Sequence, residues 1–441
     1  MQRIYEAYAY SRAPLERCLW NEDRSMPGLV ALEGNAQTEV AVIGGGFTGL
    51  SAALHLAEGG VGVTLLEAER IGWGASGRNG GFCCLGGGMM GNGELERAFD
   101  AEGRQAFHDA ESAAVALVGD LLGRHGIDAD RHSQGETILA HTARHMKALR
   151  GEVDEIARDT GTTPLLHDAD DLAALGMKGP FHGGMTIPLG FALNPGKYVA
   201  GLARAAHAAG AVLHEASPVT AIRQDAGFVL TTPGGTLHAK RLILATNGYS
   251  SEDIPGWLRA RYVPLQSNIL ATRPLTPVEL EAQGWTSRQM AYDTRSLLHY
   301  FRLLPDNRFL FGMRGGVYAT PGANRRILRK LHGEFEAMFP AWQAVERPHV
   351  WSGLVCLSRN RTPFVGAIPE MPGAFAGLAY HGNGVAMGTY AGQLLAALVQ
   401  GRTPEGPYPA AFAAPPKRFP LGRHRRALLT GINAALKLAD L

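Results

Sequence analysis

Hydrophobic and polar positions change period repeatedly within the first seventy residues of the chain. Val40–Ile43 is a continuous apolar run, too short for a helix and typical of a buried strand. Leu50–Glu58 carries apolar residues at helical spacing and ends before the pair Gly59-Gly60. Val61–Leu66 is a second short apolar run. The pattern predicts a strand, a helix and a second strand in direct succession.

Four glycines stand between the first predicted strand and the helix, and three of them, Gly44, Gly46 and Gly49, have the spacing of a nucleotide-binding motif. In this G-x-G-x-x-G spacing the first glycine permits a tight turn, the second lets a pyrophosphate approach the backbone, and the third lets the helix lie close to the strand. The helix N-terminus offers free N–H groups to an anion. Glu67 closes the second strand, about 20 residues on, where an acid accepts hydrogen bonds from an adenosine ribose and repels a 2′-phosphate. The unit predicts a dinucleotide site and disfavours NADP.

A glycine-rich loop follows this unit, with polar Ser76, Arg78 and Asn79 among glycines 72, 74, 77, 80 and 81. One interpretation is a flexible linker. The other is a backbone that lies flat against a planar ring and its ribityl chain, and it is favoured because arginine and asparagine are unusual inside a linker.

The remaining pattern predicts helices over 94–125, 144–159, 195–209 and 324–339. A strand meander is predicted at Ala211–His214, Val219–Ile222, Gly227–Thr231 and Leu237-His238, followed by a separate buried strand from Arg241. Two apolar runs, Leu297–Leu304 and Arg308–Gly312, flank the turn residues Pro305-Asp306-Asn307 and predict a hairpin. Near the end, Gly377–Tyr380 predicts a strand, His381–Gly384 a second glycine turn, and Val385–Leu398 a helix that repeats the arrangement of the first unit.

Composition narrows the function classes. The 441 residues are 46% hydrophobic and 19% charged, as in a soluble globular protein, and 57 are glycine. The formal charge of +2 argues against nucleic acid as a partner. There is no run of 18 apolar residues, no apolar region typical of a signal peptide, and no zinc-type spacing of cysteine and histidine, so we expect a cytoplasmic protein without a metal. The basic stretch Lys417–Arg426 before a tail at Ala427–Leu441 allows membrane contact, although a solvated helix is the commoner outcome.

The chain resembles the D-amino-acid-oxidase-like family of FAD-dependent amine oxidoreductases. The motifs that carry the resemblance run from Gly44–Gly49 with Glu67 through Gly74-Ala-Ser-Gly-Arg-Asn-Gly-Gly81, Leu193-Asn-Pro-Gly-Lys-Tyr-Val199, Ala245-Thr-Asn-Gly-Tyr249 and Tyr300-Phe-Arg-Leu-Leu-Pro-Asp306 to His381-Gly-Asn-Gly-Val-Ala386. They span nearly the whole chain. The combination is most similar to the γ-glutamylputrescine oxidase-like branch.

The resemblance implies an α/β fold, in which a Rossmann-like FAD-binding domain of the glutathione-reductase type joins an α+β substrate domain built on an antiparallel sheet. The FAD-binding domain would comprise residues 37–92, 186–250 and 350–400. The substrate domain would comprise 93–185 and 251–349, with an N-terminal arm at 1–36 and a C-terminal tail at 401–441.

The resemblance also implies which residues contact FAD. They are Gly44, Gly46, Phe47, Thr48, Gly49, Glu67, Ala68, Arg70, Ala75, Ser76, Gly77, Arg78, Asn79, Gly80, Val219, Thr246, Asn247, Gly248, Gly382, Asn383, Gly384 and Val385. The histidine and cysteine that carry covalent FAD in some relatives fall at Arg78 and near Gly353, with Cys356 offset from the second position, so a dissociable FAD is expected.

In this family a hydride passes from the carbon next to nitrogen to flavin N5, water hydrolyses the imine, and oxygen or another acceptor reoxidises the flavin. We expect Tyr300 and Arg302, on one strand face by the period of two, and His381 to contact an amine substrate, with Arg302 pairing to a carboxylate. Arg302 as an ordinary strand arginine and His381 as a structural histidine remain open. So do two other functions, an FAD-dependent 2-hydroxy-acid dehydrogenase and a non-catalytic flavin-binding subunit. The sequence sets neither the substrate nor the oligomeric state.

Overall fold

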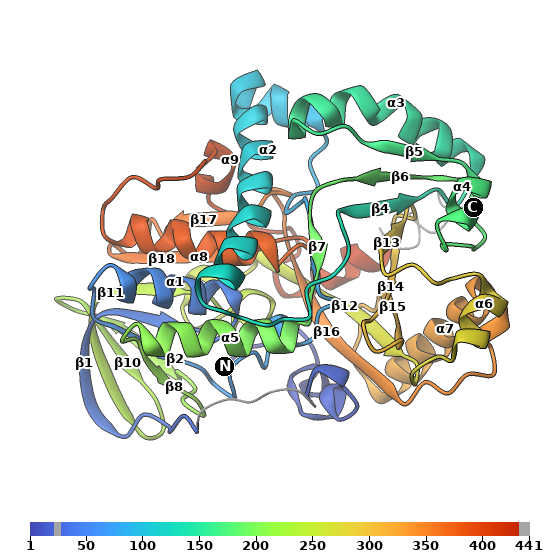
Figure 1. Ribbon diagram of the computed structural model, residues 1–441. Coiled ribbons are helices and arrows are strands. Elements are labelled where there is room, and N and C mark those ends of the chain that lie inside the picture. Colours follow the sequence, from blue (N-terminus) through green and yellow to red (C-terminus); the bar gives the residue numbers. More distant parts are fainter. Residues whose placement is uncertain (22–27, 432–441) are drawn as a thin grey trace.

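Two large sheets dominate the computed structural model, which describes residues 1–21 and 28–431 (Figure 1). The first sheet contains the predicted opening unit as β1 (Gly34–Ile43), α1 (Phe47–Glu58) and β2 (Val63–Leu66). β1 and β2 run parallel, and Val63–Leu66 is buried throughout, as a strand covered on both faces must be. The prediction of a strand, a helix and a strand is confirmed.

The first sheet has the strand order β17-β18-β11-β1-β2-β8, and β10 and β9 extend antiparallel from β11. The further strands are β8 (Val212–His214), β9 (Ala221–Gln224), β10 (Phe228–Thr231), β11 (Gly235–Leu244), β17 (Phe364–Ala367) and β18 (Ala374–Leu378). β11 lies parallel to β1 and β18, so three carboxyl ends meet at one edge of the sheet. Ligands of parallel sheets bind at such an edge.

Two predictions for this region are wrong in detail. Ala211–His214 does not belong to the meander, because β8 pairs parallel with β2 at the edge of the sheet. Leu237-His238 and the run from Arg241 are one strand, β11, whose first half pairs with β10 and whose whole length pairs with β1. Lys240, which lies between the two runs, stands with His238 and Arg241 at exposed positions of one continuous strand.

Helices cover the first sheet with the largest core cluster of the molecule. The helices of this layer are α1, α2 (Asn92–Arg124), α5 (Pro195–Ala208), α8 (Ala386–Val399) and the short α9 (Ala410–Ala413). In Figure 1, α1, α5 and α8 lie together in front of this sheet, and α2 rises from them toward α3. Glycine at position 392 permits the close contact of α8 with α1, since a Cβ there would lie 2.5 Å from the Thr48 carbonyl oxygen.

The second sheet has the order β16-β12-β15-β14-β13-β4-β6-β5 and is antiparallel except for the parallel pair β13 and β4. Its strands are β4 (Glu136–Leu139), β5 (Leu165–His167), β6 (Gly184–Ile187), β12 (Tyr262–Ala271), β13 (Met290–Asp293), β14 (His299–Leu303), β15 (Phe309–Arg314) and β16 (His349–Ser358). The helices α3 (Ala143–Thr160), α4 (Ala169–Ala174), α6 (Pro277–Gln283) and α7 (Pro321–Met338) accompany it, and a two-stranded sheet joins β3 (Phe82–Cys83) to β7 (Phe191–Ala192). The predicted hairpin is confirmed as β14 and β15.

The chain enters the second sheet twice, first through β4 to β6 and again through β12 to β16. β6 and β16 stand near the starts of two segments that the sequence assigns to the FAD-binding domain, and both strands pair within the second sheet. The exact limits of the two domains stay a prediction.

The two ends of the described chain pack against each other. Arg425 donates from Nη2 to Glu252 Oε1 at 2.7 Å, and Arg426 donates from Nη2 to Glu6 Oε1 at 2.9 Å. These two members of the basic stretch are therefore engaged within the fold, whereas the last ten residues of the predicted tail lie outside the described part. Over 1–21 and 28–431, no helix combines the length and the apolar character that crossing a bilayer requires. The four cysteines are all buried, and none of them forms a disulfide.

Candidate active site

The first glycine turn connects β1 to α1 at the carboxyl edge of the first sheet. Gly44 has a φ of +111°, and a Cβ there would lie 2.7 Å from the Ala245 carbonyl oxygen. A Cβ at Gly49 would lie 1.9 Å from the Gly44 carbonyl oxygen. Both positions exclude any side chain, the first because of the turn and the second because of the contact between helix and strand.

The amino end of α1 faces a cavity of about 180 Å³, called here the glycine-turn cavity. The N–H of Phe47 donates to Ser76 Oγ at 2.9 Å, while the N–H groups of Gly46 and Thr48 meet no acceptor within the described part of the chain. These donors and the positive end of the helix dipole favour an anionic group such as a diphosphate.

Glu67 closes β2 beside the same cavity. Its Oε2 accepts the Gly45 N–H at 2.7 Å, and its Oε1 accepts the Glu69 N–H at 3.0 Å. Burial raises the pKa of this carboxyl, and the two backbone N–H groups oppose that rise. Ala68 and Val219 line the cavity next to Glu67, which fits the ribose and adenine positions that the resemblance implies.

The structure brings most of the predicted FAD contacts to one place. Those that line the glycine-turn cavity are Gly44, Gly46, Phe47, Thr48, Glu67, Ala68, Ala75, Ser76, Asn79, Val219, Thr246, Asn247, Gly382, Gly384 and Val385. Those that line the adjoining cavity described below are Arg78, Gly80 and Asn383. Four line neither cavity, namely Gly49, Arg70, Gly77 and Gly248. Of these, Gly49 shapes the turn, and Arg70 donates to Asn21 Oδ1 at 2.8 Å, away from both cavities.

Arg78 is 2% exposed and lies between the rings of Trp73 and Tyr249, 5.2 Å from each centroid. Its Nε donates to the Trp73 carbonyl oxygen at 2.7 Å and its Nη1 to that of Ser352 at 3.2 Å. Its Nη2 has no partner in the described part of the chain. A buried guanidinium N–H without an acceptor is costly, so this donor fits a ligand atom in the cavity that Arg78 lines.

The second glycine turn follows β18 and completes the site. Ala379, His381 and Gly382 have φ values of 66°, 51° and 116°, and the Ala379 N–H donates to Asn247 Oδ1 at 2.9 Å. This bond ties the turn after β18 to the turn after β11. α8 begins directly after the turn at Ala386, so the amino ends of α1 and α8 belong to the two glycine turns that line one cavity.

A second cavity of about 360 Å³, called here the sheet cavity, lies between the second sheet and the second glycine turn. The residues that line both cavities, and therefore join them, are Ala75, Asn79, Leu354, Val355, His381, Gly382 and Val385. An elongated ligand can thus extend from Glu67 past both glycine turns to the sheet cavity.

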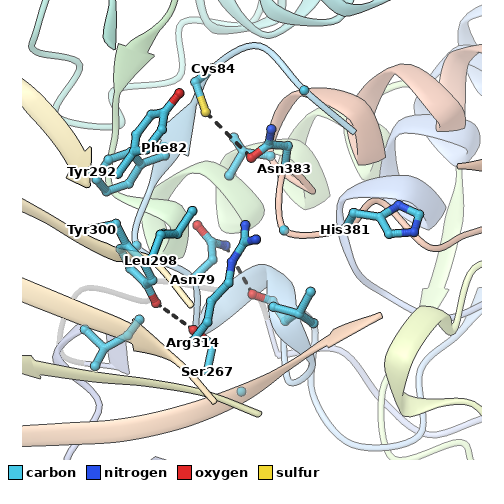
Figure 2. A pocket seen from close by; sticks show the side chains of 18 of the residues that line it. Asn79, Phe82, Cys84, Ser267, Tyr292, Leu298, Tyr300, Arg314, His381 and Asn383 are labelled. Carbon is cyan, nitrogen blue, oxygen red and sulfur yellow. Dashed lines mark hydrogen bonds between the residues drawn. The ribbon is translucent and has the colours of Figure 1, made fainter. Parts of the chain in front are cut away.

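Apolar and aromatic side chains form one wall of the sheet cavity (Figure 2). Phe82 and Tyr300 meet edge to face with centroids 5.6 Å apart, and Leu298 directly precedes β14, the strand that carries Tyr300. The hydroxyls of Tyr300 and Ser267 share a hydrogen bond of 2.9 Å. Glycine at 312 makes room for the Tyr300 ring, because a Cβ there would lie 2.1 Å from it. This wall suits a carbon chain and keeps water from it.

Arg302 does not line the sheet cavity, although it shares a strand face with Tyr300 as expected. It is fully buried, and it donates from Nε to the Gly80 carbonyl oxygen at 2.9 Å and from Nη2 to that of Leu193 at 2.7 Å. Its Nη1 lies 2.9 Å from His132 Nε2. Each of the three guanidinium nitrogens already has a protein partner, so the placement of Arg302 does not fit the carboxylate-binding role that the sequence predicted for it.

His381 lies between the two cavities, but both ring nitrogens are occupied. Nδ1 lies 3.0 Å from the Gly87 carbonyl oxygen, and Nε2 lies 3.2 Å from the Ser358 N–H. A carbonyl requires a donor and an N–H requires an acceptor, so the ring is neutral with its proton on Nδ1. Burial lowers the pKa of His381 to about 4. This geometry fits the structural alternative, in which His381 holds the glycine turn.

The neutral state of His381 predicts a pH-dependent contribution to stability. Because its pKa is about 4 when folded and about 6.5 when unfolded, the unfolded chain binds the extra proton between these values, and stability falls as pH falls through that window. The free energy of unfolding of the wild type relative to His381→Asn should therefore drop by about 1.4 kcal/mol per pH unit between pH 6 and 4. Urea unfolding at several pH values, with FAD in excess, measures this; parallel profiles would contradict it.

The sequence missed two ionisable side chains of the sheet cavity. Arg314 ends β15 and lines the cavity, and its Nη2 would lie 2.1 Å from a Cβ at Gly382, so the guanidinium rests against the second glycine turn. Figure 2 shows it extending from the sheet into the space between Tyr300 and Asn383. No acidic side chain in the described residues pairs with it. Glu136, at the start of β4, is the second.

The joined cavities fit the parts of FAD. Gly46 and the amino end of α1 would hold the diphosphate, Glu67 the ribose, Ser76 and Asn79 the ribityl chain, and Gly382 with its neighbours the ring. FAD bound there would supply a hydride acceptor beside the sheet cavity. Arg314 and Tyr300 would then orient a substrate against it. In the described part of the chain no group of three His, Cys, Asp or Glu side chains could hold a metal ion.

Comparison with known proteins agrees with this geometry. The family model described as DAO, FAD dependent oxidoreductase, matches residues 39–398. The probable oxidoreductase OrdL of Rhizobium meliloti (strain 1021) is 32% identical over 407 residues, covering 91% of this chain and 92% of its own. Gamma-glutamylputrescine oxidoreductase of Escherichia coli (strain K12) is 29% identical over 397 residues, covering 90% and 91%. In fold, glycine oxidase from Geobacillus kaustophilus superposes with a TM-score of 0.68 at 22% identity, over 84% of this chain and 96% of that one.

Proposed function

Since the chain belongs to the DAO family of FAD-dependent oxidoreductases, we propose that it oxidises a carbon–nitrogen bond of an amine or amino acid that also carries a carboxylate. Its cofactor is FAD, held without a covalent bond. The two positions that align with covalent attachment in other relatives are Arg78 and Gly353, and they lie against each other, with a Cβ at Gly353 only 3.2 Å from Arg78 Cβ.

The observation that carries the proposal is Arg314, a cation with no acidic partner among residues 1–21 and 28–431, in a cavity that opens onto the FAD site. Desolvation of a charge is unfavourable unless a ligand compensates it, and a guanidinium matches a carboxylate through two parallel hydrogen bonds. The apolar wall of Phe82, Leu298 and Tyr300 suits the carbon chain between the carboxylate and the reacting nitrogen. The name of the Escherichia coli relative, which refers to γ-glutamylputrescine, supports a γ-glutamylated amine as one such substrate.

The 2-hydroxy-acid alternative is less well supported. It requires a base for the hydroxyl proton. His381 lines the sheet cavity with both ring nitrogens occupied, which leaves the carboxyl of Glu136 as the group that could take that proton. The amine substrate is preferred because the Escherichia coli relative is named for an amine, γ-glutamylputrescine. The alternative of a non-catalytic subunit is set aside, because the family is one of oxidoreductases and both cavities are formed.

Anaerobic mixing of the FAD-loaded enzyme with a substrate panel tests the proposal. The panel contains N-alkyl amino acids, γ-glutamyl polyamines, free polyamines and 2-hydroxy acids, and loss of the yellow flavin absorbance reports oxidation. We expect amines that carry a carboxylate to bleach the flavin fastest. Bleaching by 2-hydroxy acids alone would overturn the proposal. Reoxidation is then followed with oxygen and with artificial acceptors, because the physiological acceptor is not set by this site.

A further inference from the structure

Glu136 is a buried carboxyl, and one of its two oxygens has no hydrogen-bond partner in the described residues. It is 1% exposed at the start of β4, and its Oε1 accepts the Leu85 N–H at 3.2 Å. Its Oε2 has no hydrogen-bond partner in the described part of the chain. The side chain lines the sheet cavity, so this oxygen is available to a ligand there. A buried carboxylate oxygen without a donor costs free energy, which a ligand can recover.

Three groups from separate elements act on this carboxyl, namely Tyr292 on β13, Cys84 after β3 and Glu111 on α2. Arg314 on β15 acts in turn on Tyr292. Burial raises the pKa of Glu136 to about 7, and the negative charge of Glu111 adds to the rise, while the hydroxyl of Tyr292 and the N–H of Leu85 oppose it. The carboxyl is therefore poised to ionise when a cation enters the cavity.

The sheet cavity thus contains an acidic side chain, Glu136, and a basic side chain, Arg314, that do not pair with each other. Glu136 and Arg314 form no ion pair with each other, and neither has an oppositely charged partner of its own within the described residues. Keeping a carboxylate and a guanidinium desolvated and apart is unfavourable unless a ligand bridges them. A ligand that carries both an ammonium and a carboxylate satisfies both at once, whereas a simple polyamine or a simple acid leaves one charge uncompensated.

We propose that Glu136 is the ammonium subsite of the sheet cavity and that, together with Arg314, it makes the cavity selective for zwitterionic amines. The assignment rests on the proposed function, and it deepens it by naming the substrate class. A step in which the ammonium gives its proton to the Glu136 carboxylate leaves a neutral amine and a neutral carboxylic acid, so charge and protons balance. Glu136 would then bind the substrate in its common charged form and release it to react as the free amine.

Three probes of the same shape test the subsite without any turnover. tert-Butylamine is a cation, pivalate an anion and tert-butanol neutral, and none has a hydrogen on the carbon that carries its functional group. Each is titrated into the FAD-loaded enzyme, and the visible spectrum of bound FAD reports binding. At pH 8, Glu136→Gln should lower the affinity for tert-butylamine about tenfold or more, and should change the affinities for pivalate and tert-butanol less than about twofold. Arg314→Met should lower the affinity for pivalate and leave that for tert-butylamine unchanged.

The wild type gives a second readout that does not depend on folding of a variant. Its affinity for tert-butylamine should rise about tenfold per pH unit as pH approaches the pKa of about 7 from below, and should level off above it. Affinity for tert-butanol should stay constant over the same range. The proposal would be overturned if Glu136→Gln lowered the affinities for pivalate and tert-butylamine equally, or if the affinity of the wild type for tert-butylamine did not change with pH. Anaerobic bleaching by amines that persists alongside such a result would leave the proposed function standing, so the two failures are distinguishable.

Discussion

Replacing Gly46 by alanine is expected to yield a colourless protein whose affinity for FAD is weaker by about 100-fold, or about 3 kcal/mol. Gly46 caps α1 at the point where the backbone of the glycine-turn cavity must approach the diphosphate. A Cβ there would lie 2.8 Å from Ser76 Oγ and would also take space that the diphosphate requires. The measurement is the ratio of flavin to protein absorbance after purification, followed by titration of the apoprotein with FAD.

Two matched variants separate the steric causes. In Gly46→Ala combined with Ser76→Gly the contact with Ser76 is removed, so FAD binding should stay weaker than in Ser76→Gly alone if the diphosphate is what the methyl group displaces. Gly62→Ala places a methyl group 3.6 Å from Glu39, an ordinary contact far along the chain from the turn, and should bind FAD normally. A Gly46→Ala protein that purifies yellow would contradict the assignment of the first glycine turn to the FAD site.

The FAD half of the site was predictable because its signals are local. Gly44 and Gly46 lie between β1 and α1, and Gly49 lies in the first turn of α1. Gly49 packs against Gly44, and Gly44 packs against Ala245 at the end of the neighbouring strand β11. Glu67 follows from the end of the next strand. The second turn was visible for the same reason, as a strand, glycines and a helix around Gly382.

The substrate half was not predictable, because it depends on pairings between distant strands. Glu136 reaches the cavity only because β4 pairs parallel with β13, which the sequence analysis did not find. β13 is a short strand, Met290–Asp293, without an alternating pattern that sets it apart. The parallel register, which sets Glu136 opposite Met290, follows from the fold of the whole domain and not from either segment.

Arg302 and Arg314 show the same limit within a single hairpin. The period of two correctly set Leu298, Tyr300 and Arg302 on one face and Phe301 in the core on the other. It could not tell how far along the strand the cavity extends. Arg302 lies beyond its end, between the carbonyls of Gly80 and Leu193. Extending the hairpin pairing past Gly312 would have placed Arg314 beside Leu298, whose carbonyl oxygen accepts the Arg314 N–H at 3.3 Å.

Replacing Arg314 by methionine is expected to lower kcat/KM for amines that carry a carboxylate by about 100- to 1,000-fold, with only a few-fold change for an amine of similar size that lacks one. Methionine keeps much of the side-chain volume and removes the guanidinium, and loss of one partner of a desolvated charge pair costs about 3–4 kcal/mol. The FAD content should stay normal, because Arg314 lines the sheet cavity and not the glycine-turn cavity. Steady-state rates and anaerobic flavin reduction with matched amines measure the effect.

The matched controls decide which arginine recognises the carboxylate. Arg314→Lys keeps the charge and loses the two-pronged fork, so its loss should be intermediate, about tenfold. Arg302→Met removes bonds to Gly80 and Leu193 in the core, so it should lower the unfolding midpoint while preserving the preference for amines with a carboxylate. The reverse pattern, in which Arg302→Met abolishes that preference and Arg314→Met keeps it, would show that Arg302 binds the substrate carboxylate. The placement of Arg302 among backbone carbonyls argues against that outcome, since each nitrogen of this buried guanidinium already has a protein partner.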